Sequence, residues 1–197
     1  SSIPTGLYQF EIGSNLYTGP GMDTTFTIPL LLRMGVYNNT ELQVAYASEY
    51  LTLGILYGGI SFLENIENSI ILTTSLTKNN NSLTEYSAYF PISYTFNNGF
   101  SILAQASGMT LNTNESDPVI SYLLAAGNSL SERSSWFVEA YQSRQIDQDD
   151  PPFLIDYGIT YLSKKNFQLD ISMGISFEKD EQKYKESSRF IEWGCSL

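Results

Sequence analysis

The sequence predicts an all-β protein, an antiparallel up-and-down transmembrane β-barrel of about twelve strands, and three observations support this fold class. Apolar and polar residues alternate with period two over stretches of ten or more residues. Turn residues separate about twelve such stretches along the 197 residues. The connections alternate between tight turns and longer polar links, as periplasmic turns and extracellular loops do. No linker or change of composition divides the chain, so we expect residues 1–197 to form one domain.

The alternation is clearest between residues 167 and 177, where every odd position is apolar and every even position is polar or glycine. This stretch is longer than the five or six residues of an average soluble strand and matches the nine to eleven that span a membrane. We expect strands over residues 7–18, 24–37, 41–52, 54–64, 69–78, 83–96, 100–111, 118–130, 135–146, 153–163, 167–178 and 189–197.

Composition and charge exclude several classes of protein. No apolar run reaches the 18 or so residues of a transmembrane helix. Cys195 is the single cysteine, so no intrachain disulfide can form, and we expect it to be a small apolar side chain on a strand. The chain starts without Met or a signal peptide, which we interpret as a mature or trimmed form. A net charge of −11 argues against nucleic acid as a partner.

The sequence contains no histidine. Its absence removes the general base of Ser-His and Asp-His hydrolases and the commonest transition-metal ligand. With one cysteine, a zinc site is also not expected, and we predict no cofactor and no bound metal. A carboxylate-pair glycosidase is formally compatible with the many acids, but no motif supports it. We therefore expect that the protein is not an enzyme.

Aromatic residues gather at both ends of the predicted strands, on the apolar face. Such belts mark the two interfaces of a transmembrane barrel. An alternative is a soluble sandwich or lipocalin-like barrel with these aromatic residues in its core, but its outer face would then carry Asp, Glu and Gln without the usual Lys. The expected belts comprise Phe96, Phe100, Trp136, Tyr161 and Phe167 at the short turns, and Phe26, Tyr86, Phe153 and Phe177 at the opposite end.

Several short stretches resemble one bacterial family. They are Pro4 to Glu11, the segment Leu31 to Val36 followed by Glu41 and Leu42, and the late stretches Asp156 to Leu162 and Phe167 to Asp170. These are similar to the first strand, an Arg-x-Gly…Glu-Leu hairpin and the penultimate hairpin of the family called putative MetA-pathway of phenol degradation, or simply "transporter". The resemblance implies an outer-membrane barrel. We take no phenol chemistry from the name.

The polar face carries seven acids and one base, which in a barrel point into the lumen. We expect Arg33, Glu41, Glu139, Asp156, Asp170 and Glu192 to line the lumen or a constriction in it. One interpretation is a structural network that fills a narrow barrel; another is a constriction that selects solutes, with a preference for cations. Hairpin parity, pairing Tyr37 with Glu41, predicts that Arg33 reaches Glu41, with Glu139 and Asp170 as other candidates. The seven acids are Glu11, Glu41, Glu85, Glu139, Asp156, Asp170 and Glu192.

These features predict a Gram-negative outer-membrane protein, and the first functional hypothesis is a small passive, porin-like channel or transporter. The second is a closed structural or docking barrel, a subunit of an envelope assembly, and the third is a soluble ligand-binding barrel. Expected partners are outer-membrane lipid and lipopolysaccharide, small solutes or cations, and other envelope proteins. The acidic run Asp147 to Asp150 only weakly resembles a calcium loop, and divalent ions shared with lipopolysaccharide are an alternative to a solvated loop.

Overall fold

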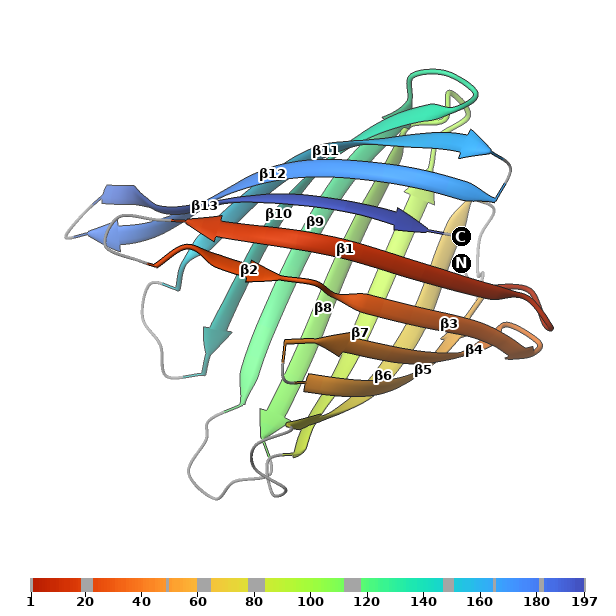
Figure 1. The fold of residues 1–197 in the computed structure, drawn as a ribbon, viewed down its shortest axis with the longest axis horizontal. Helices are drawn as coiled ribbons and strands as arrows, with labels where there is room; N and C mark the ends of the chain where they lie inside the picture. Colours follow the sequence, from red (N-terminus) through yellow and green to blue (C-terminus); the bar gives the residue numbers. More distant parts are fainter. Residues whose placement is uncertain are drawn as a thin grey trace.

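The computed structural model describes residues 2–18, 23–48, 50–59, 65–77, 84–111, 118–146, 151–164, 166–180 and 183–196 (Figure 1). In this part of the chain, thirteen strands form one sheet in which neighbouring strands are antiparallel. They are β1 (Tyr8–Thr18), β2 (Thr25–Thr27), β3 (Leu30–Tyr37), β4 (Thr40–Ala47), β5 (Tyr50–Gly58), β6 (Ile66–Thr77), β7 (Thr84–Thr95), β8 (Ser101–Leu111), β9 (Val119–Ser129), β10 (Ser134–Gln145), β11 (Phe153–Lys164), β12 (Phe167–Asp180) and β13 (Lys183–Ser196).

The sheet closes because β1 pairs with β13, from Glu11 opposite Ser196 to Thr18 opposite Arg189. β2 and β3 both pair with β1 and are separated by Ile28 and Pro29. Proline has no N–H to donate to a neighbouring strand, so it interrupts the ladder there. The thirteen strands therefore occupy twelve positions around a closed antiparallel barrel, which confirms the predicted fold class. Both termini lie at the end that carries the β3–β4 turn, also as predicted (Figure 1).

The predicted boundaries between residues 41 and 78 are wrong. The chain turns at Ser48, whose φ is 56°, and not near residue 53. The exposed apolar residues of β4 stand at even positions up to Tyr46, whereas those of β5 stand at odd positions from Leu51 to Tyr57. A two-residue connection between antiparallel strands produces this change of parity. The predicted strand 54–64 therefore ends at Gly58, and the predicted strand 69–78 begins earlier, at Ile66.

The predicted long link over residues 178–188 is also wrong, because β12 continues to Asp180 and β13 begins at Lys183. The charged composition of this stretch suggested a loop. Strands that extend beyond the hydrocarbon region do not need an apolar face, so their backbones pair without the usual alternation. The acidic run at 147–150 and the terminal Leu197 lie outside the described residues.

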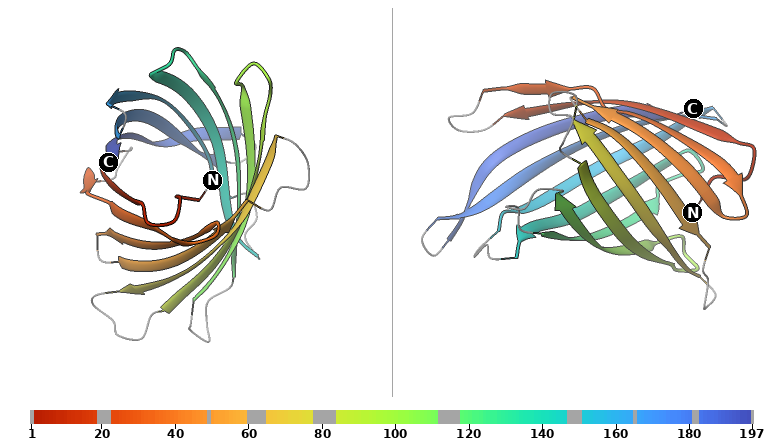
Figure 2. Two further views of the ribbon diagram at one scale, coloured as in Figure 1. Left: turned by 90° about the vertical axis from the view of Figure 1, so that its right-hand side faces the viewer. Right: turned by 90° about the horizontal axis from the view of Figure 1, so that it is seen from below.

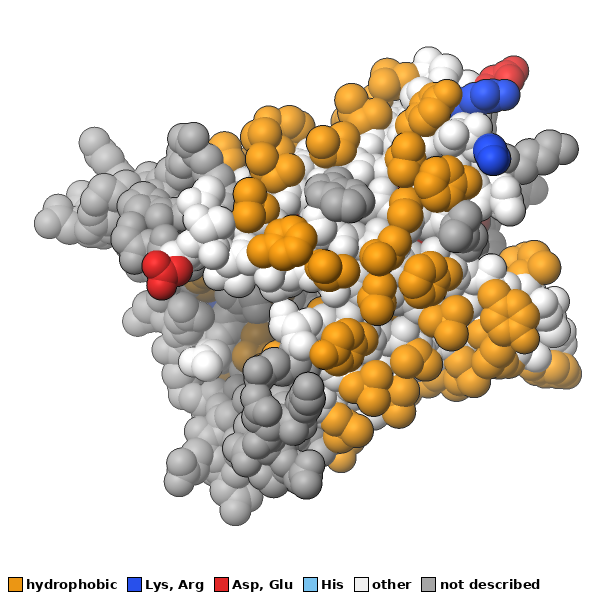
Figure 3. All heavy atoms as spheres, in the orientation of Figure 1, with side chains coloured by type: hydrophobic (Ala, Val, Ile, Leu, Met, Phe, Trp, Pro, Cys, Tyr) orange, Lys and Arg blue, Asp and Glu red, His pale blue; other side chains and the backbone are white. Residues whose placement is uncertain are grey.

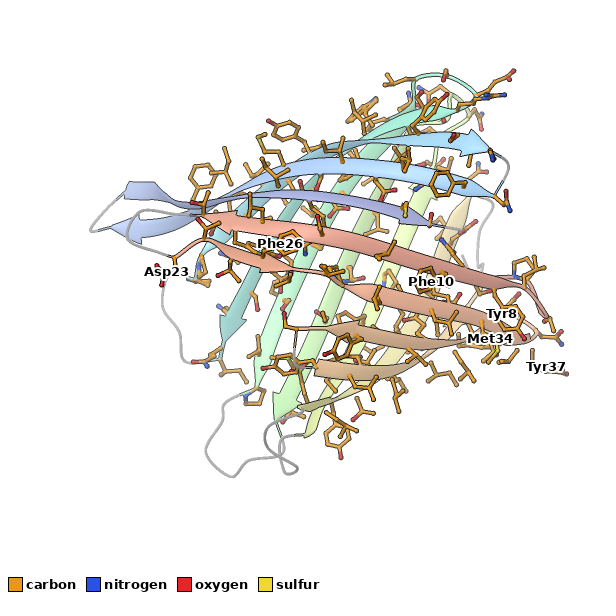
Figure 4. The ribbon with its side chains drawn as sticks, in the orientation of Figure 1. Tyr8, Phe10, Asp23, Phe26, Met34 and Tyr37 are labelled. Carbon is orange, nitrogen blue, oxygen red and sulfur yellow. The ribbon has the colours of Figure 1, made fainter. Side chains whose placement is uncertain are left out.

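Burial in the barrel is the reverse of that in a soluble domain. Among the described residues, the buried hydrophobic core consists of Leu56 alone, whereas the buried polar side chains are those of five serines and Glu41. Large apolar side chains cover the outer face, which is visible in Figure 3 as an extended orange surface and in Figure 4 along β1 and β2, at Tyr8, Phe10 and Phe26. This distribution argues against the soluble barrel. No helix in the described chain is long and apolar enough to cross a membrane.

Aromatic side chains form a connected group at the short-turn end of the outer face. The ring centroids of Phe96 and Phe100 are 5.7 Å apart, and those of Phe100 and Trp136 are 6.4 Å apart. Tyr94 packs edge-on against Phe96 at 4.7 Å. At the opposite end, Phe26 and Tyr86 are exposed. These positions agree with the predicted interfacial belts.

The facing of β12 predicts opposite outcomes for two adjacent substitutions. Ile171 is 57% exposed on the outer face, whereas Ser172 is 8% exposed and its backbone lies opposite Glu192. Ile171→Arg should lower the free energy of unfolding in lipid vesicles by about 2–4 kcal/mol if the site is near the bilayer midplane. Ser172→Arg should cost much less, since the guanidinium then faces carboxylates. Equal losses for the two variants would contradict the facing.

Candidate functional site

The inward side of the barrel is hollow. Four cavities of about 390, 330, 550 and 240 Å³ share walls with one another. The first and second share Asp170 and Glu192, and the first and third share Leu31 and Ala45. The third and fourth share Ile71 and Gln105. The four cavities therefore follow one another along the inner face of the barrel, from the β10–β13 wall past β1, β3 and β4 to β8.

Arg33 is the centre of a polar cluster on the β1–β3–β4 wall. Its Nε donates to Oε1 of Glu41 at 2.6 Å, and its Nη2 donates to Oε2 at 3.0 Å. Nη1 donates to Oε1 of Gln9 at 3.1 Å and lies 3.6 Å from a carboxylate oxygen of Glu11. Two parallel N–H···O bonds are the strongest arrangement of a guanidinium and a carboxylate. The predicted Arg33–Glu41 ion pair is confirmed.

Glu41 is fully buried, with an exposed fraction of 0%, and both its oxygens accept hydrogen bonds. Besides Arg33, the donors are Nε2 of Gln43 to Oε1 at 2.8 Å and the backbone N–H of Ile3 to Oε2 at 2.9 Å. Burying a carboxylate is costly unless it is paired and hydrogen-bonded, and these donors offset that cost. Glu41 is thus a structural anchor and not a group available to solutes.

The β3–β4 register from which this ion pair was predicted differs from the register in the structure. Tyr37 pairs with Thr40, and Glu41 pairs with Gly35, because a bulge lies between Gly35 and Tyr37. The turn is two residues long, with Asn39 in the left-handed region at a φ of 60°. Glu41 still faces inward because it lies two residues before Gln43, which is directly opposite Arg33.

A second group of acids lines the β10–β13 wall. Glu139 and Asp156 are directly opposite each other on β10 and β11. Together with Asp170 and Glu192 they line the cavity of about 330 Å³. Gln168 donates to Asp170 at 2.9 Å, and Oδ1 of Asp156 is buried without a hydrogen-bond partner among the described residues. No Lys or Arg is among the residues that line this cavity.

The structure therefore divides the six predicted site residues into two groups. Arg33 and Glu41 are joined directly, whereas Glu139, Asp156, Asp170 and Glu192 line a different cavity. Sequence reasoning missed Gln9, Gln43 and the backbone of Ile3, which complete the Arg33 cluster. It also missed Glu67, which lines the same cavity as Arg33. Placing the β6 start at Ile66 would have revealed Glu67.

In the described part of the chain, no group of three or more His, Cys, Asp or Glu side chains is arranged to hold a metal ion. The residues of the lumen are carboxylates, amides and hydroxyls around an open space. Such a lining can attract, repel or hydrogen-bond solutes that pass through it.

Comparison with known proteins agrees with this geometry. The family model described as "Putative MetA-pathway of phenol degradation" matches residues 67–192, well over half of the chain. The chain belongs to this family. No match was found among curated protein sequences.

Among solved structures, the barrel is similar to the KdgM porin in complex with disordered oligogalacturonate, with a TM-score of 0.72 and 9% identity over 96% of this chain and 98% of that one. It is also similar to the NanC porin, with a TM-score of 0.70 and 10% identity over 95% and 98% of the two chains. The COG4313 outer membrane channel from Pseudomonas putida F1 gives 0.67 and 12% over 100% and 97%. These identities establish likeness of fold alone. With its apolar outer face, this member of the family is an outer-membrane β-barrel.

The Arg33 cluster predicts a stability effect. Arg33→Ala leaves Glu41 buried without its ion-pair partner and should lower the free energy of unfolding by about 3 kcal/mol, near the lower end for breaking a buried pair because Arg33 is 19% exposed. Urea unfolding in detergent measures this loss. Adding Glu41→Gln should recover part of it. Arg144→Ala, at an exposed position on β10, is the control and should have little effect. An unchanged Arg33→Ala barrel would contradict the anchoring role of the pair.

Proposed function

We propose that the protein is a passive channel for small solutes, with a preference for cations. The observation that carries this proposal is the hollow interior, in which four cavities share lining residues. A barrel that served only as a docking surface has no need for a polar, open interior. The fold likeness to proteins described as porins and channels supports the same conclusion.

Charge supports the preference for cations. Arg33 is the one Lys or Arg among the residues that line the four cavities, and Glu41 neutralises it directly. The remaining charges of the lining are all negative. In a narrow lumen with low-dielectric walls, an excess of carboxylates over cationic groups lowers the energy of a passing cation and raises that of an anion. The carboxylates are those of Glu11, Glu67, Glu85, Glu139, Asp156, Asp170 and Glu192.

Likeness to the KdgM porin does not carry its ligand to this chain. An oligogalacturonate is a polyanion, and the β10–β13 wall would repel it. We therefore propose that Glu139, Asp156, Asp170 and Glu192 form the selecting wall, whereas Arg33 and Glu41 hold the adjoining β1–β3–β4 wall in shape.

Current through planar bilayers with a KCl gradient tests the proposal. The parent should conduct, and the sign of its reversal potential should show that K⁺ is more permeant than Cl⁻. The triple variant Glu139→Gln, Asp156→Asn, Glu192→Gln should lose most of this preference, because the wall loses three charges. Asp23→Asn, at an exposed position before β2, is the control and should keep it.

A silent parent that is correctly folded would contradict the channel and favour the docking barrel. A conducting parent with anion preference, or a triple variant with unchanged selectivity, would contradict the role of the acidic wall.

A further inference from the structure

The largest of the four lumen cavities, about 550 Å³, lies on the β3–β8 side of the barrel and shares no described lining residue with the acidic cavity of β10–β13. In the left view of Figure 2, which looks along the barrel from the short-turn end, β3 to β8 form a continuous curved side of the ring, orange through yellow to green. Thr52 near the start of β5 and Glu85 near the start of β7 both line the cavity, so it lies toward the end opposite the β3–β4 turn. Its volume is within the range of pockets that hold small molecules.

Hydroxyl side chains from two neighbouring strands lie side by side in this cavity. Thr52 on β5 is directly opposite Ser75 on β6, and their hydroxyl oxygens are 2.8 Å apart. Thr73, two residues before Ser75, lines the same cavity. Each hydroxyl offers one donor and two acceptor positions, so a single mutual hydrogen bond leaves further capacity for a solute.

Two carboxamides and an aromatic ring belong to the same lining. Gln43 comes from β4 and Gln105 from β8, on two sides of the cavity. Tyr89 on β7 is directly opposite Ile71 on β6, and both line the cavity. An aromatic ring has a partly negative face, against which the C–H groups of a saturated ring pack favourably. The lining therefore combines hydrogen-bonding groups with an apolar ring face, the two kinds of surface that a carbohydrate ring also presents.

Glu85 is the one charged side chain among the described residues that line this cavity. Its backbone is directly opposite that of Ser75. Its Oε1 accepts a hydrogen bond from the Ser87 hydroxyl at 3.4 Å, which is long for a hydroxyl donor, so the carboxylate keeps acceptor capacity for a cationic group. Hydrogen bonds between an ammonium group and a carboxylate are about twice as strong as those between neutral groups.

We propose that this cavity is a binding site for a small amino sugar, a ring that carries several hydroxyls and one protonated amine. The amine binds Glu85, the ring hydroxyls exchange hydrogen bonds with Thr52 and Ser75, and the C–H face of the ring packs on Tyr89. A site built to hydrogen-bond hydroxyls also discriminates against solutes without them, because its own polar groups are then left unpaired. This inference rests on the proposed channel function, since a solute reaches the cavity through the lumen, and it names the class of solute.

Block of the K⁺ current in planar bilayers by three probes tests the proposal. Glucosamine at about pH 6 carries both the hydroxyls and the charge. N-acetylglucosamine has hydroxyls without the charge, and cyclohexylammonium has the charge on a ring without hydroxyls. In the parent, glucosamine should halve the current at a concentration about five-fold or more below that of either comparison probe. Equal half-blocking concentrations for the three probes would overturn the site.

Two single substitutions test the role of the charge. Glu85→Gln should abolish the preference for glucosamine over N-acetylglucosamine. Glu139→Gln removes a carboxylate of the same type from the β10–β13 wall and should keep that preference, although it lowers the general preference for cations. Equal losses in the two variants would indicate the general field of the lumen and not a site at Glu85.

A double substitution tests the hydroxyls. Thr52→Val combined with Ser75→Ala removes both partners of one hydrogen bond, so neither is left unpaired, and should abolish the preference for glucosamine over cyclohexylammonium. The matched control is Ser121→Ala combined with Ser143→Ala, a second hydroxyl pair at 2.9 Å that is not among the described residues lining the four cavities. The control should keep the preference. A preference that survived in the first double variant would contradict the assigned role of these hydroxyls.

The failures of the two proposals are distinguishable. A folded parent that conducts K⁺ without preferential block keeps the channel function and overturns the amino-sugar site. A folded parent without current contradicts the channel function, and titration calorimetry with glucosamine in detergent then decides the site. The parent should bind glucosamine about five-fold or more tightly than Glu85→Gln does. Equal binding, or no binding by the parent, would overturn the site.

Discussion

In hydrocarbon, each backbone N–H or C=O without a partner costs several kcal/mol, so a membrane-spanning sheet must close on itself. The pairing of β1 with β13 meets this requirement. Once the sheet is closed, period-two alternation assigns every side chain to lipid or lumen. The outer face takes the large apolar residues, and the interior takes serines, amides and carboxylates. The hollow, acidic lumen is thus a consequence of closure combined with the residues at inward positions.

Within that lumen, the charges lie on two adjoining walls of the barrel. On one wall, Arg33 and Glu41 neutralise each other, and Glu41 is fully covered. This pair stabilises the wall, and Glu41 also accepts a hydrogen bond from the backbone N–H of Ile3. On the other wall, carboxylates face open space without a cation among the residues lining their cavity. A buried ion pair adds specificity of arrangement at a cost in desolvation, whereas under the proposed function the half-buried acids of the β10–β13 wall shape the field that a solute meets.

The fold class and the inward or outward facing of most side chains could be predicted from the sequence, because period-two patterning depends only on neighbouring residues. The facing of Ile171 and the Arg33–Glu41 contact both followed from parity. The turn at Ser48 was missed although the parity of apolar residues changes there. The hydrogen bond from Ile3 to Glu41 leaves no periodic signal, since it joins residues far apart in the chain. Which inward acids share a cavity depends on the stagger of the strands around the barrel, which alternation does not encode.

The proposed function requires that the interior be an open path that prefers cations. Liposome swelling in three isotonic solutes of similar size, one a cationic amine, one uncharged and one a carboxylate, tests it most directly. The acidic lining predicts entry rates in the order cation, neutral solute, anion. Fastest entry of the anion, or no swelling in any solute by a folded barrel, would contradict the claim.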